Sequence, residues 1–419
     1  LMNIQKLNNW IRSQKKINKM KIKKISFEST NNWGINSSEI FNNKKKFFSI
    51  NPYQFKNQDR KKWYQPLIIQ KEVGILGIIK QKVKKIDYYL LQAKVEPGNI
   101  DNIQLSPTVQ ATKSNYLRAH GGKKTKYLKY FIRKSRNQNI LKNLRLSEQG
   151  TRYFEKSNKN ILVDIKKQKI KKHKNFIWLS KMDLTYLIKK KNLLNMDSIS
   201  VFSSSIKKEK FDVPINRFFE IINKYKYFSK KLYIIKKKIL FKEMKGWKIF
   251  DKKIYDIKKR FFSIISLKVE SNSREVNKWF QPIISDHSSS FNGFLCKKTN
   301  KTNHYLLKCV IEPGFKKPKF TSTVAIKNFR YSNKNDKYLK FFKNKKNILF
   351  DVINSDEGGR FFKNETRNMI VFLKNKKDIK VKNNYIWASH NQVIELINKN
   401  LISIEARNLF ASFNIDKIK

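Results

Sequence analysis

Short stretches of this chain combine hydrophobic and polar residues in the way that half-buried strands do. Residues 73–81, 86–95 and 102–112 are rich in β-branched and aromatic side chains and partly alternate with polar ones, which predicts sheet strands. Residues 147–160 predict a short helix before a strand at 161–167, although Gly150 weakens the helical signal near its start. The pattern therefore predicts a mixed α+β structure.

Two helices are predicted to begin at serines. Ser180 is followed three residues later by Asp183, and Ser389 by Gln392, which is the spacing of a capping box. Each box precedes a stretch whose apolar residues recur on one helical face. These residues are Leu184, Leu187 and Ile188 in the first stretch, and Val393, Ile394 and Ile397 in the second.

The chain repeats itself, and the repeat sets its domain organisation. Ten residues of the first half recur in the second at a constant offset: Trp63, Gln65, Pro66, Gly77, Tyr89, Leu90, Leu91, Glu96, Pro97 and Gly98 match Trp279, Gln281, Pro282, Gly293, Tyr305, Leu306, Leu307, Glu312, Pro313 and Gly314. The repeating unit spans roughly 200 residues, the size of a whole domain. We therefore predict two tandem copies, residues 1–207 and 208–419, each a mixed sheet with flanking helices.

The charge is extreme but spread along the chain. With 94 Lys+Arg against 31 Asp+Glu, the formal net charge is +63, which permits nucleic-acid binding. A dedicated polyanion binder concentrates its basic residues on one face or tail, whereas here they run from end to end. Lys, Asn, Ile and Phe are all abundant while Gly and Pro are scarce, as A+T-rich codons would favour. We therefore expect a lysine-coated surface and no specific nucleic-acid partner.

Other composition features indicate the compartment. Two cysteines, Cys296 and Cys309, cannot form a disulfide framework. No apolar run approaches the length of a membrane span, and the N-terminal residues lack a hydrophobic signal core. We expect a cytoplasmic protein without a membrane partner.

The first copy contains a dense polar stretch that could form a site. Because strand side chains alternate, Gln92, Lys94 and Glu96 share one face of a strand, as do Thr108, Gln110 and Thr112 on the next. If these faces coincide, they form a site for an oxygen-rich ligand, with further polar groups from Asn99, Gln104, Asn115, Tyr116 and His120. The alternative is structural: Lys94 and Glu96 form an exposed ion pair, the Glu-Pro-Gly sequence is an ordinary turn, and His120 is an exposed loop residue.

Several common chemistries have no signature here. The sequence contains no phosphate-binding GxxxxGK[ST] loop, no GxGxxG, no HExxH and no GxSxG. The five histidines have no metal-ligand spacing, so neither a metal nor a nucleotide cofactor is expected.

With these residues identified, the chain resembles the NDP-hexose 2,3-dehydratases, which act on dTDP-4-keto-6-deoxyhexoses in deoxysugar biosynthesis. The resemblance rests on Trp63–Pro66, 74–78, Leu90–Tyr116, the His-Gly-Gly at 120–122, 147–154, 176–179 and 192–198. It implies tandem Nudix-like domains that have lost hydrolysis, a homodimer, and elimination of water from C2 and C3 to give a 3,4-diketo-2,6-dideoxy sugar nucleotide for a partner 3-ketoreductase. No hydride moves, so no cofactor is implied.

The implied reaction suggests roles for the polar residues. The C4 ketone acidifies the hydrogen at C3, so Glu96 is the candidate base and Lys94 the candidate partner of the enolate oxygen. Tyr116 or His120 would protonate the leaving hydroxyl. Trp63 is a candidate for stacking on thymine, and arginines can grip the pyrophosphate bidentately. The remaining binding candidates are Gln65, Gln92, Asn99, Gln104, Thr108, Gln110, Thr112, Asn115, Arg152, Arg360 and Arg407.

The second copy lacks part of this set. Gln92 and Lys94 become Lys308 and Val310, and no His-Gly-Gly follows, so we expect a degenerate second pocket. In the first copy, Ile199 stands where the family pattern has an arginine, as Arg407 does in the second. Two alternatives to the dehydratase stay open from sequence: a noncatalytic or decayed sugar-nucleotide-binding protein, and a basic nucleic-acid-binding protein.

Overall fold

A computed structural model describes most of the chain. The described residues are 4–30, 32–44, 47–117, 124–132, 138–250, 253–327, 336–343, 347–374 and 379–419. The strands and main helices of the two halves follow the same order. No helix in the described ranges is long and apolar enough to cross a membrane.

Each repeat contributes one large seven-stranded sheet. The first has the order β10-β11-β6-β7-β12, with β8 beside β7 and β9 beside β6; the second has the order β22-β23-β18-β19-β24, with β20 beside β19 and β21 beside β18. The first sheet comprises β6 (Gly74–Val83), β7 (Ile86–Val95), β8 (Ile103–Ser106), β9 (Val109–Ala111), β10 (Asn139–Ser147), β11 (Ser157–Asp164) and β12 (Phe176–Ser180). The second comprises β18 (Ser290–Thr299), β19 (Thr302–Val310), β20 (Lys319–Thr321), β21 (Val324–Ile326), β22 (Ile348–Ser355), β23 (Glu365–Phe372) and β24 (Tyr385–Ser389).

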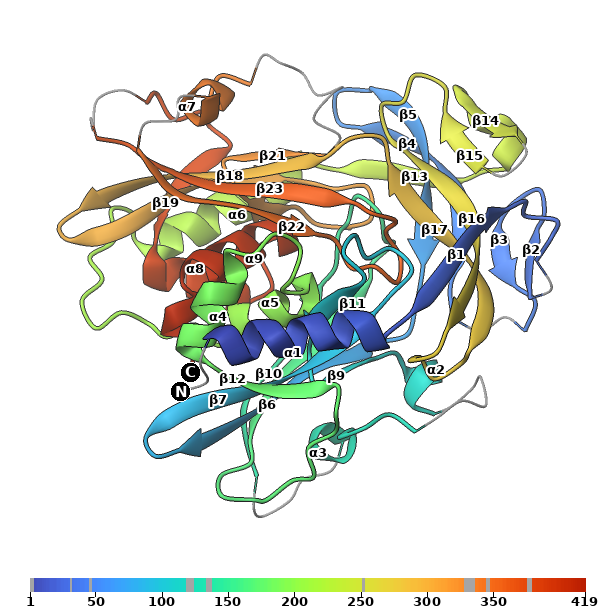
Figure 1. The fold of residues 1–419 in the computed structure, drawn as a ribbon. Coiled ribbons are helices and arrows are strands. Elements are labelled where there is room, and N and C mark those ends of the chain that lie inside the picture. The colour runs from blue at the N-terminus through green and yellow to red at the C-terminus, as the bar shows by residue number, and fades with distance from the viewer. Residues whose placement is uncertain are drawn as a thin grey trace.

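A layer of helices lies between the two large sheets (Figure 1). The helices are α4 (Lys181–Ile188), α5 (Met196–Ser203), α8 (His390–Asn398) and α9 (Ile404–Phe413). Helix α5 packs on the first sheet and α9 on the second, and the two helices contact each other. Their apolar faces share one continuous core with the inner faces of both sheets, so the repeats are joined through a common interior.

Two smaller sheets pack together beside this layer, and each is built from both repeats. In the first, β4 (Ser49–Asn57) pairs with β13 (Ile234–Lys238) from the second repeat; in the other, β16 (Phe262–Ser271) pairs with β1 (Met20–Ile25) from the first. The two repeats thus exchange their first strands (Figure 1). The other members are β2 (Trp33–Ile35), β3 (Ile40–Asn42), β5 (Lys62–Ile69), β14 (Trp247–Phe250), β15 (Lys253–Asp256) and β17 (Lys278–Asp286).

The remaining helices are peripheral or short. Helices α1 (Ile4–Ile17) and α6 (Phe218–Lys231) precede the exchanged strands and pack apolar residues against the shared core. The short ones are α2 (Lys113–Tyr116), α3 (Lys129–Ile132), α7 (Leu339–Lys343) and the 3₁₀ turns η1 (Phe241–Glu243) and η3 (Ile415–Lys417).

Most of the expected elements are present. The three predicted strands correspond to β6, β7 and the pair β8 and β9, which is interrupted at Pro107-Thr108. Both capping boxes are confirmed, because the side chains of Ser180 and Ser389 accept hydrogen bonds from the backbone N–H groups of Asp183 and Gln392, and the serine backbone N–H groups donate to the side chains of those two residues. The prediction of a mixed structure built on a duplicated sequence is confirmed.

The prediction of a helix over residues 147–160 is wrong. Residues 148–156 form turns, and strand β11 already begins at Ser157. The backbone there is engaged elsewhere: Ile68 N–H donates to the carbonyl of Arg152, and Phe154 N–H donates to the carbonyl of Ile68. These tertiary hydrogen bonds outweigh the weak local helical preference.

The Glu-Pro-Gly turns join the repeats at two equivalent points. Gly98 N–H donates to the Gly358 carbonyl at 2.7 Å, and Gly314 N–H donates to the Gly150 carbonyl at 2.6 Å. A Cβ atom on Gly98 would lie 1.7 Å from the Phe361 carbonyl oxygen, and one on Gly314 would lie 1.7 Å from that of Tyr153. Glycine is therefore required at both turns because another backbone occupies the space.

Gly314→Ala should destabilise the protein by on the order of 3 kcal/mol, because the backbone of residue 153 must move. Urea unfolding followed by circular dichroism measures the change. Lys317→Ala is the matched control, since Lys317 is exposed in the same loop. Equal unfolding midpoints for Gly314→Ala and the wild type would contradict the close approach of the two repeats.

Candidate functional site

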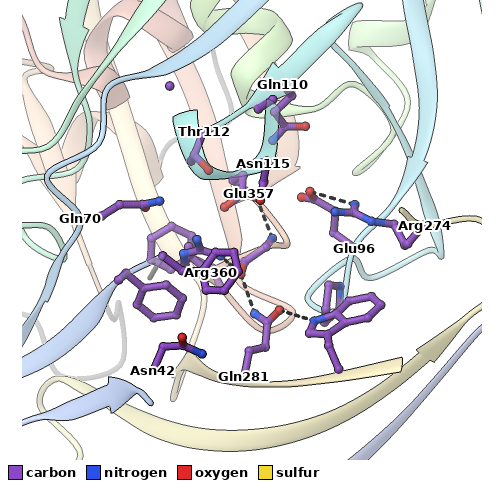
Figure 2. A pocket seen from close by; sticks show the side chains of 18 of the residues that line it. Asn42, Gln70, Glu96, Gln110, Thr112, Asn115, Arg274, Gln281, Glu357 and Arg360 are labelled. Atoms are coloured by element: carbon purple, nitrogen blue, oxygen red, sulfur yellow. Dashed lines mark hydrogen bonds and ion pairs between the residues drawn. The ribbon is translucent and has the colours of Figure 1, made fainter. Parts of the chain in front are cut away.

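A pocket with a volume of about 620 Å³ is lined by residues of both repeats. The first repeat contributes β7, β9 and the hairpin around Trp33, and the second contributes Arg274, strand β17 and the loop at 356–361 (Figure 2). Its polar lining includes Asn42, Gln70, Lys94, Glu96, Gln110, Thr112, Asn115, Glu148, Lys156, Arg274, Gln281, Glu357 and Arg360.

Glu96 is held as a carboxylate by two cations. Its Oε1 lies 2.8 Å from Lys94 Nζ and 3.4 Å from Arg274 Nη1. Burial by itself would raise the pKa of Glu96, but Lys94 and then Arg274 outweigh it and lower the pKa to about 2. Arg274 is fixed in turn by donating to the Val95 carbonyl at 2.9 Å. Glu96 is therefore ionised at neutral pH.

Glu357, from the second repeat, lies within hydrogen-bond reach of Glu96. Its Oε1 accepts the backbone N–H of Gly359 at 2.8 Å. Burial, followed by the negative charge of Glu96, raises the pKa of Glu357 well above its ordinary value. Two carboxyl groups that act on each other in this way do not both ionise readily, so the pair favours a proton on Glu357 and the charge on Glu96.

Further side chains link this pair to the helix layer. Lys94 Nζ also donates to Gln110 Oε1 at 2.9 Å, and Gln110 Nε2 donates to Asp197 Oδ2 at 2.6 Å. Asp197 follows the N-cap residue Asn195 of α5, and burial raises its pKa well above the ordinary value. The network fixes the orientation of Gln110 and gives Lys94 partners on two sides.

Lys156 is a second amine in the wall of the pocket. Its Nζ donates to the Glu72 carbonyl, and burial lowers the pKa of Lys156 to about 8 although Glu148 opposes the shift. Glu148 accepts a hydrogen bond from Asn158 Nδ2 at 2.7 Å. Lys156 is thus an amine whose proton can be given up near neutral pH.

The other end of the pocket is aromatic. The rings of Trp33 and Phe48 lie 4.7 Å apart, and the guanidinium carbon of Arg360 lies 4.1 Å from the centre of the Phe48 ring. Trp279 also lines the pocket, but its ring lies under the guanidinium group of Arg274, on the side of Glu96. The pocket therefore offers acid–base groups at one end and flat apolar surfaces with a cation at the other (Figure 2).

The structure brings only part of the predicted site together. Lys94, Glu96, Gln110, Thr112, Asn115 and Arg360 line the pocket. Gln92 lines a smaller adjoining hollow of about 170 Å³, which shares Lys94, Gln110 and Arg274 with the main pocket. Tyr116 packs against the core on the outer face of the first large sheet, and His120 lies outside the described residues.

Several predicted ligands have structural partners instead. The Thr108 hydroxyl accepts the N–H of Ile79 and donates to the Leu90 carbonyl, which joins β6 to β7. Asn99 donates to the carbonyls of Lys94 and Asn102, and Gln104 bonds Asn192, Ser355 and Asn195. These side chains hold loops in place because their polar groups are buried and must be satisfied.

Trp63 and Gln65 also lie away from this pocket. Trp63 stacks on Phe55 with ring centres 5.2 Å apart and donates to Gln65, which donates to the Thr151 carbonyl. Their second-repeat counterparts Trp279 and Gln281 line the pocket instead. The exchanged architecture explains the error, because each small sheet faces the large sheet of the other repeat.

Two predicted arginines are also elsewhere. Arg152 forms an ion pair with Asp286, with 2.8 Å between Nη2 and Oδ1. Arg407 is fully buried between α5 and α9, where its Nη2 donates to Ser200 Oγ at 3.1 Å. Arg407 does reach the first repeat as expected, but it lies behind the pocket and not in it.

The residues that the sequence interpretation missed come mainly from the second repeat. Arg274, Trp279, Gln281 and Glu357 all line the first-repeat pocket. The repeat itself was the available signal, since Trp279 and Gln281 match Trp63 and Gln65. Recognising their role required knowing that the repeats exchange strands.

The equivalent pocket of the second repeat is nearly closed, at about 90 Å³. Lys327 occupies it and pairs with Glu405 at 3.2 Å. Glu312, the counterpart of Glu96, has no lysine like Lys94 because Val310 stands there, and burial raises the pKa of Glu312 to about 8. Gln149 stands where Glu357 is in the other pocket. This pocket lacks the charged carboxylate and its acid partner.

Comparisons with known proteins agree along nearly the whole chain. The family model for NDP-hexose 2,3-dehydratase matches residues 4–204 and 221–413. A dTDP-4-dehydro-6-deoxy-α-D-glucopyranose 2,3-dehydratase of Streptomyces violaceoruber is 29% identical over 393 residues, covering 90% of this chain and 88% of the relative. Proteins of the same description from Amycolatopsis orientalis and Saccharopolyspora spinosa are 28% and 26% identical, covering 99% and 97% of this chain and 90% of each relative. The chain belongs to the NDP-hexose 2,3-dehydratase family, as its sequence predicts.

Proposed function

We propose that the pocket of the first repeat eliminates water from C2 and C3 of dTDP-4-dehydro-6-deoxyglucose, giving a 3,4-diketo-2,6-dideoxy sugar nucleotide. The observation that carries this proposal is the pairing of an ionised Glu96 with a protonated Glu357 in one pocket. Elimination needs a base at C3 and an acid at the C2 hydroxyl, and the pair supplies one of each.

In this proposal Glu96 takes the proton from C3 and Glu357 protonates the hydroxyl that leaves C2. The electron pair of the C3–H bond first moves towards the C4 oxygen, and the enolate then expels water from C2. Lys94 and Lys156 are the amines available to stabilise the enolate oxygen. The resulting enol returns to the 3-ketone by protonation at C2. Glu357 takes the acid role first considered for Tyr116 and His120, because it lies beside Glu96.

Binding of the nucleotide uses the opposite end of the pocket. The aromatic rings of Trp33 and Phe48 offer flat surfaces for a pyrimidine, and Arg360 offers a cation for the diphosphate. The amides of Asn42, Gln70 and Gln281 can donate to oxygens of the base or sugar (Figure 2). This orientation leaves the hexose beside Glu96.

The finer architectural and cellular assignments are also proposals. We assign each repeat to a Nudix-like fold. The mixed sheet supports this assignment, since in the first repeat β6 and β11 run parallel and pack against helix α5. A homodimer, a partner 3-ketoreductase that uses the product, a cytoplasmic location and the lack of a cofactor follow from the reaction and the family resemblance. The division at residues 207 and 208 falls between α5 and α6.

Incubation with dTDP-4-dehydro-6-deoxyglucose should lower the mass of the sugar nucleotide by one water molecule. Mass spectrometry of the product, trapped by a diamine that reacts with 1,2-diketones, detects the change. A substrate that keeps its mass while bound to the protein would contradict the proposal and favour a noncatalytic binder. Salt-sensitive binding to random duplex DNA in place of sugar-nucleotide binding would favour the nucleic-acid alternative.

Glu96→Gln and Glu357→Gln should each lower kcat by about 10²- to 10⁴-fold, because each removes one proton-transfer group. Steady-state kinetics on the folded variants measures the loss. Glu312→Gln is the matched control, since it makes the same change in the closed second pocket and should leave kcat unchanged. Wild-type kcat in Glu357→Gln would exclude Glu357 as the acid.

Glu357→Gln should also change how stability depends on pH. A glutamate in the unfolded chain has a pKa of about 4.3, whereas the pKa of folded Glu357 is raised. Between these two pKa values the unfolded state loses a proton that the folded state keeps, so wild-type stability falls as pH rises, by up to about 1.4 kcal/mol per pH unit. Glutamine does not titrate. The free energy of unfolding of the variant should therefore rise relative to that of the wild type as pH rises above about 4.

Urea unfolding at several pH values between about 5 and 8 measures this difference. Glu96→Gln should remove a pH-dependent contribution only at lower pH, because the pKa of Glu96 is lowered and the stability it contributes is lost as pH falls from about 4 towards about 2. A constant difference between Glu357→Gln and the wild type at all pH values would mean that Glu357 is ionised in the folded protein.

A further inference from the structure

The two repeats build the same arrangement around Arg360 and Arg152. Arg360 from the second repeat lies over Phe48 of the first, at 4.1 Å, and Arg152 from the first lies over Phe262 of the second, at 4.5 Å. Each arginine donates from Nη1 to the carbonyl of the preceding residue, and that carbonyl also accepts a glutamine amide, from Gln281 or Gln65. The two guanidinium groups are thus held in equivalent places.

One residue beside each arginine differs in a decisive way. Asp286 ends β17 opposite Phe262 and pairs with Arg152, with 2.8 Å between Oδ1 and Nη2. At the equivalent place, after β5 and beside Phe48, the first repeat has Gln70. An uncharged amide therefore stands where the other repeat has the carboxylate that neutralises its arginine.

The exchange leaves hydrogen-bond donors without acceptors in the large pocket. Gln70 is only 4% exposed, yet its Nε2 has no hydrogen-bond partner among the described residues, and neither does Nε of Arg360. Arg360 acts electrostatically on Glu357 but forms no ion pair with any described carboxylate. Figure 2 shows Gln70 and Arg360 on the same side of the pocket, across from Glu96 and Arg274. Unsatisfied buried donors are costly unless a ligand supplies acceptors.

We propose that Gln70 determines which of the two equivalent arginines binds the diphosphate of a sugar nucleotide. Because Gln70 carries no charge, Arg360 stays available, and the amide adds a second donor for a phosphate oxygen. Asp286 makes Arg152 unavailable to a ligand, because its carboxylate forms an ion pair with the Arg152 guanidinium group. This assignment rests on the proposed function, since it identifies the diphosphate subsite of the same pocket.

The test is Gln70→Asp, which would reproduce the Asp286–Arg152 pair at Arg360. Thymidine 5′-diphosphate is the probe, and isothermal titration calorimetry measures its dissociation constant. We expect binding on the order of 100-fold weaker, because the new carboxylate takes Arg360 and repels the phosphates. With the sugar-nucleotide substrate, KM should rise and kcat at saturation should stay close to wild type.

Thermal unfolding of the ligand-free variants separates this effect from damage to the fold. Gln70→Asp should unfold at a higher temperature than the wild type, because it gains an ion pair at an unpaired arginine. Gln70→Asn is the matched control; it keeps an uncharged amide and should bind the probe within a few-fold of wild type.

Two results would overturn the inference: wild-type binding by Gln70→Asp, or weaker binding accompanied by lower thermal stability. Failure of the proposed function looks different. In that case the wild-type protein binds thymidine 5′-diphosphate and Gln70→Asp does not, but neither protein dehydrates the sugar nucleotide. Dehydration by both proteins with equal KM values would leave the reaction established and refute the role of Gln70 alone.

Discussion

The exchange of first strands between the repeats is the constraint on which the rest of the structure depends. Strand β1 completes a sheet of the second repeat and β13 completes a sheet of the first. Each small sheet therefore contains strands of both copies, and neither copy supplies all the strands of a small sheet. The exchange also carries β17 and the loop of Glu357 to the pocket of the first repeat, so this pocket is built from both halves of the chain.

Duplication allowed the two pockets to diverge while the framework stayed the same. The framework residues remain paired: Thr108 and Thr323 join equivalent strands, and Gly98 and Gly314 dock at equivalent carbonyls. The charged residues differ between the two pockets. The first has Lys94 beside Glu96, whereas Lys327 occupies the second. In the second pocket the charge of Lys327 is therefore paired within the protein.

The sequence predicted local features better than the assembled site. Capping boxes and strands depend on neighbouring residues, so Ser180 and Ser389 were identified correctly from spacing alone. Glu96 and Lys94 were found because alternation along one strand places them on one face. Glu357 and Arg274 could not be found in this way, because their positions depend on pairing between residues of different repeats. Gln104 and Asn99 were predicted to bind the ligand because they are polar. Their side chains instead form hydrogen bonds with buried groups of neighbouring loops, which the sequence does not show.

The lysine-rich composition has a consequence for the chain during synthesis. Strand β1 is made long before its partner β16, and β4 waits in the same way for β13, so strand edges stay unpaired until the second repeat leaves the ribosome. Unpaired edges are templates for aggregation, and lysines on them discourage pairing with other chains. Strand β1, with the sequence MKIKKI, carries its lysines at exposed positions. Lysines on such an edge are the residues expected where a strand must wait for its partner, a constraint that concerns folding and is separate from the recognition of a ligand.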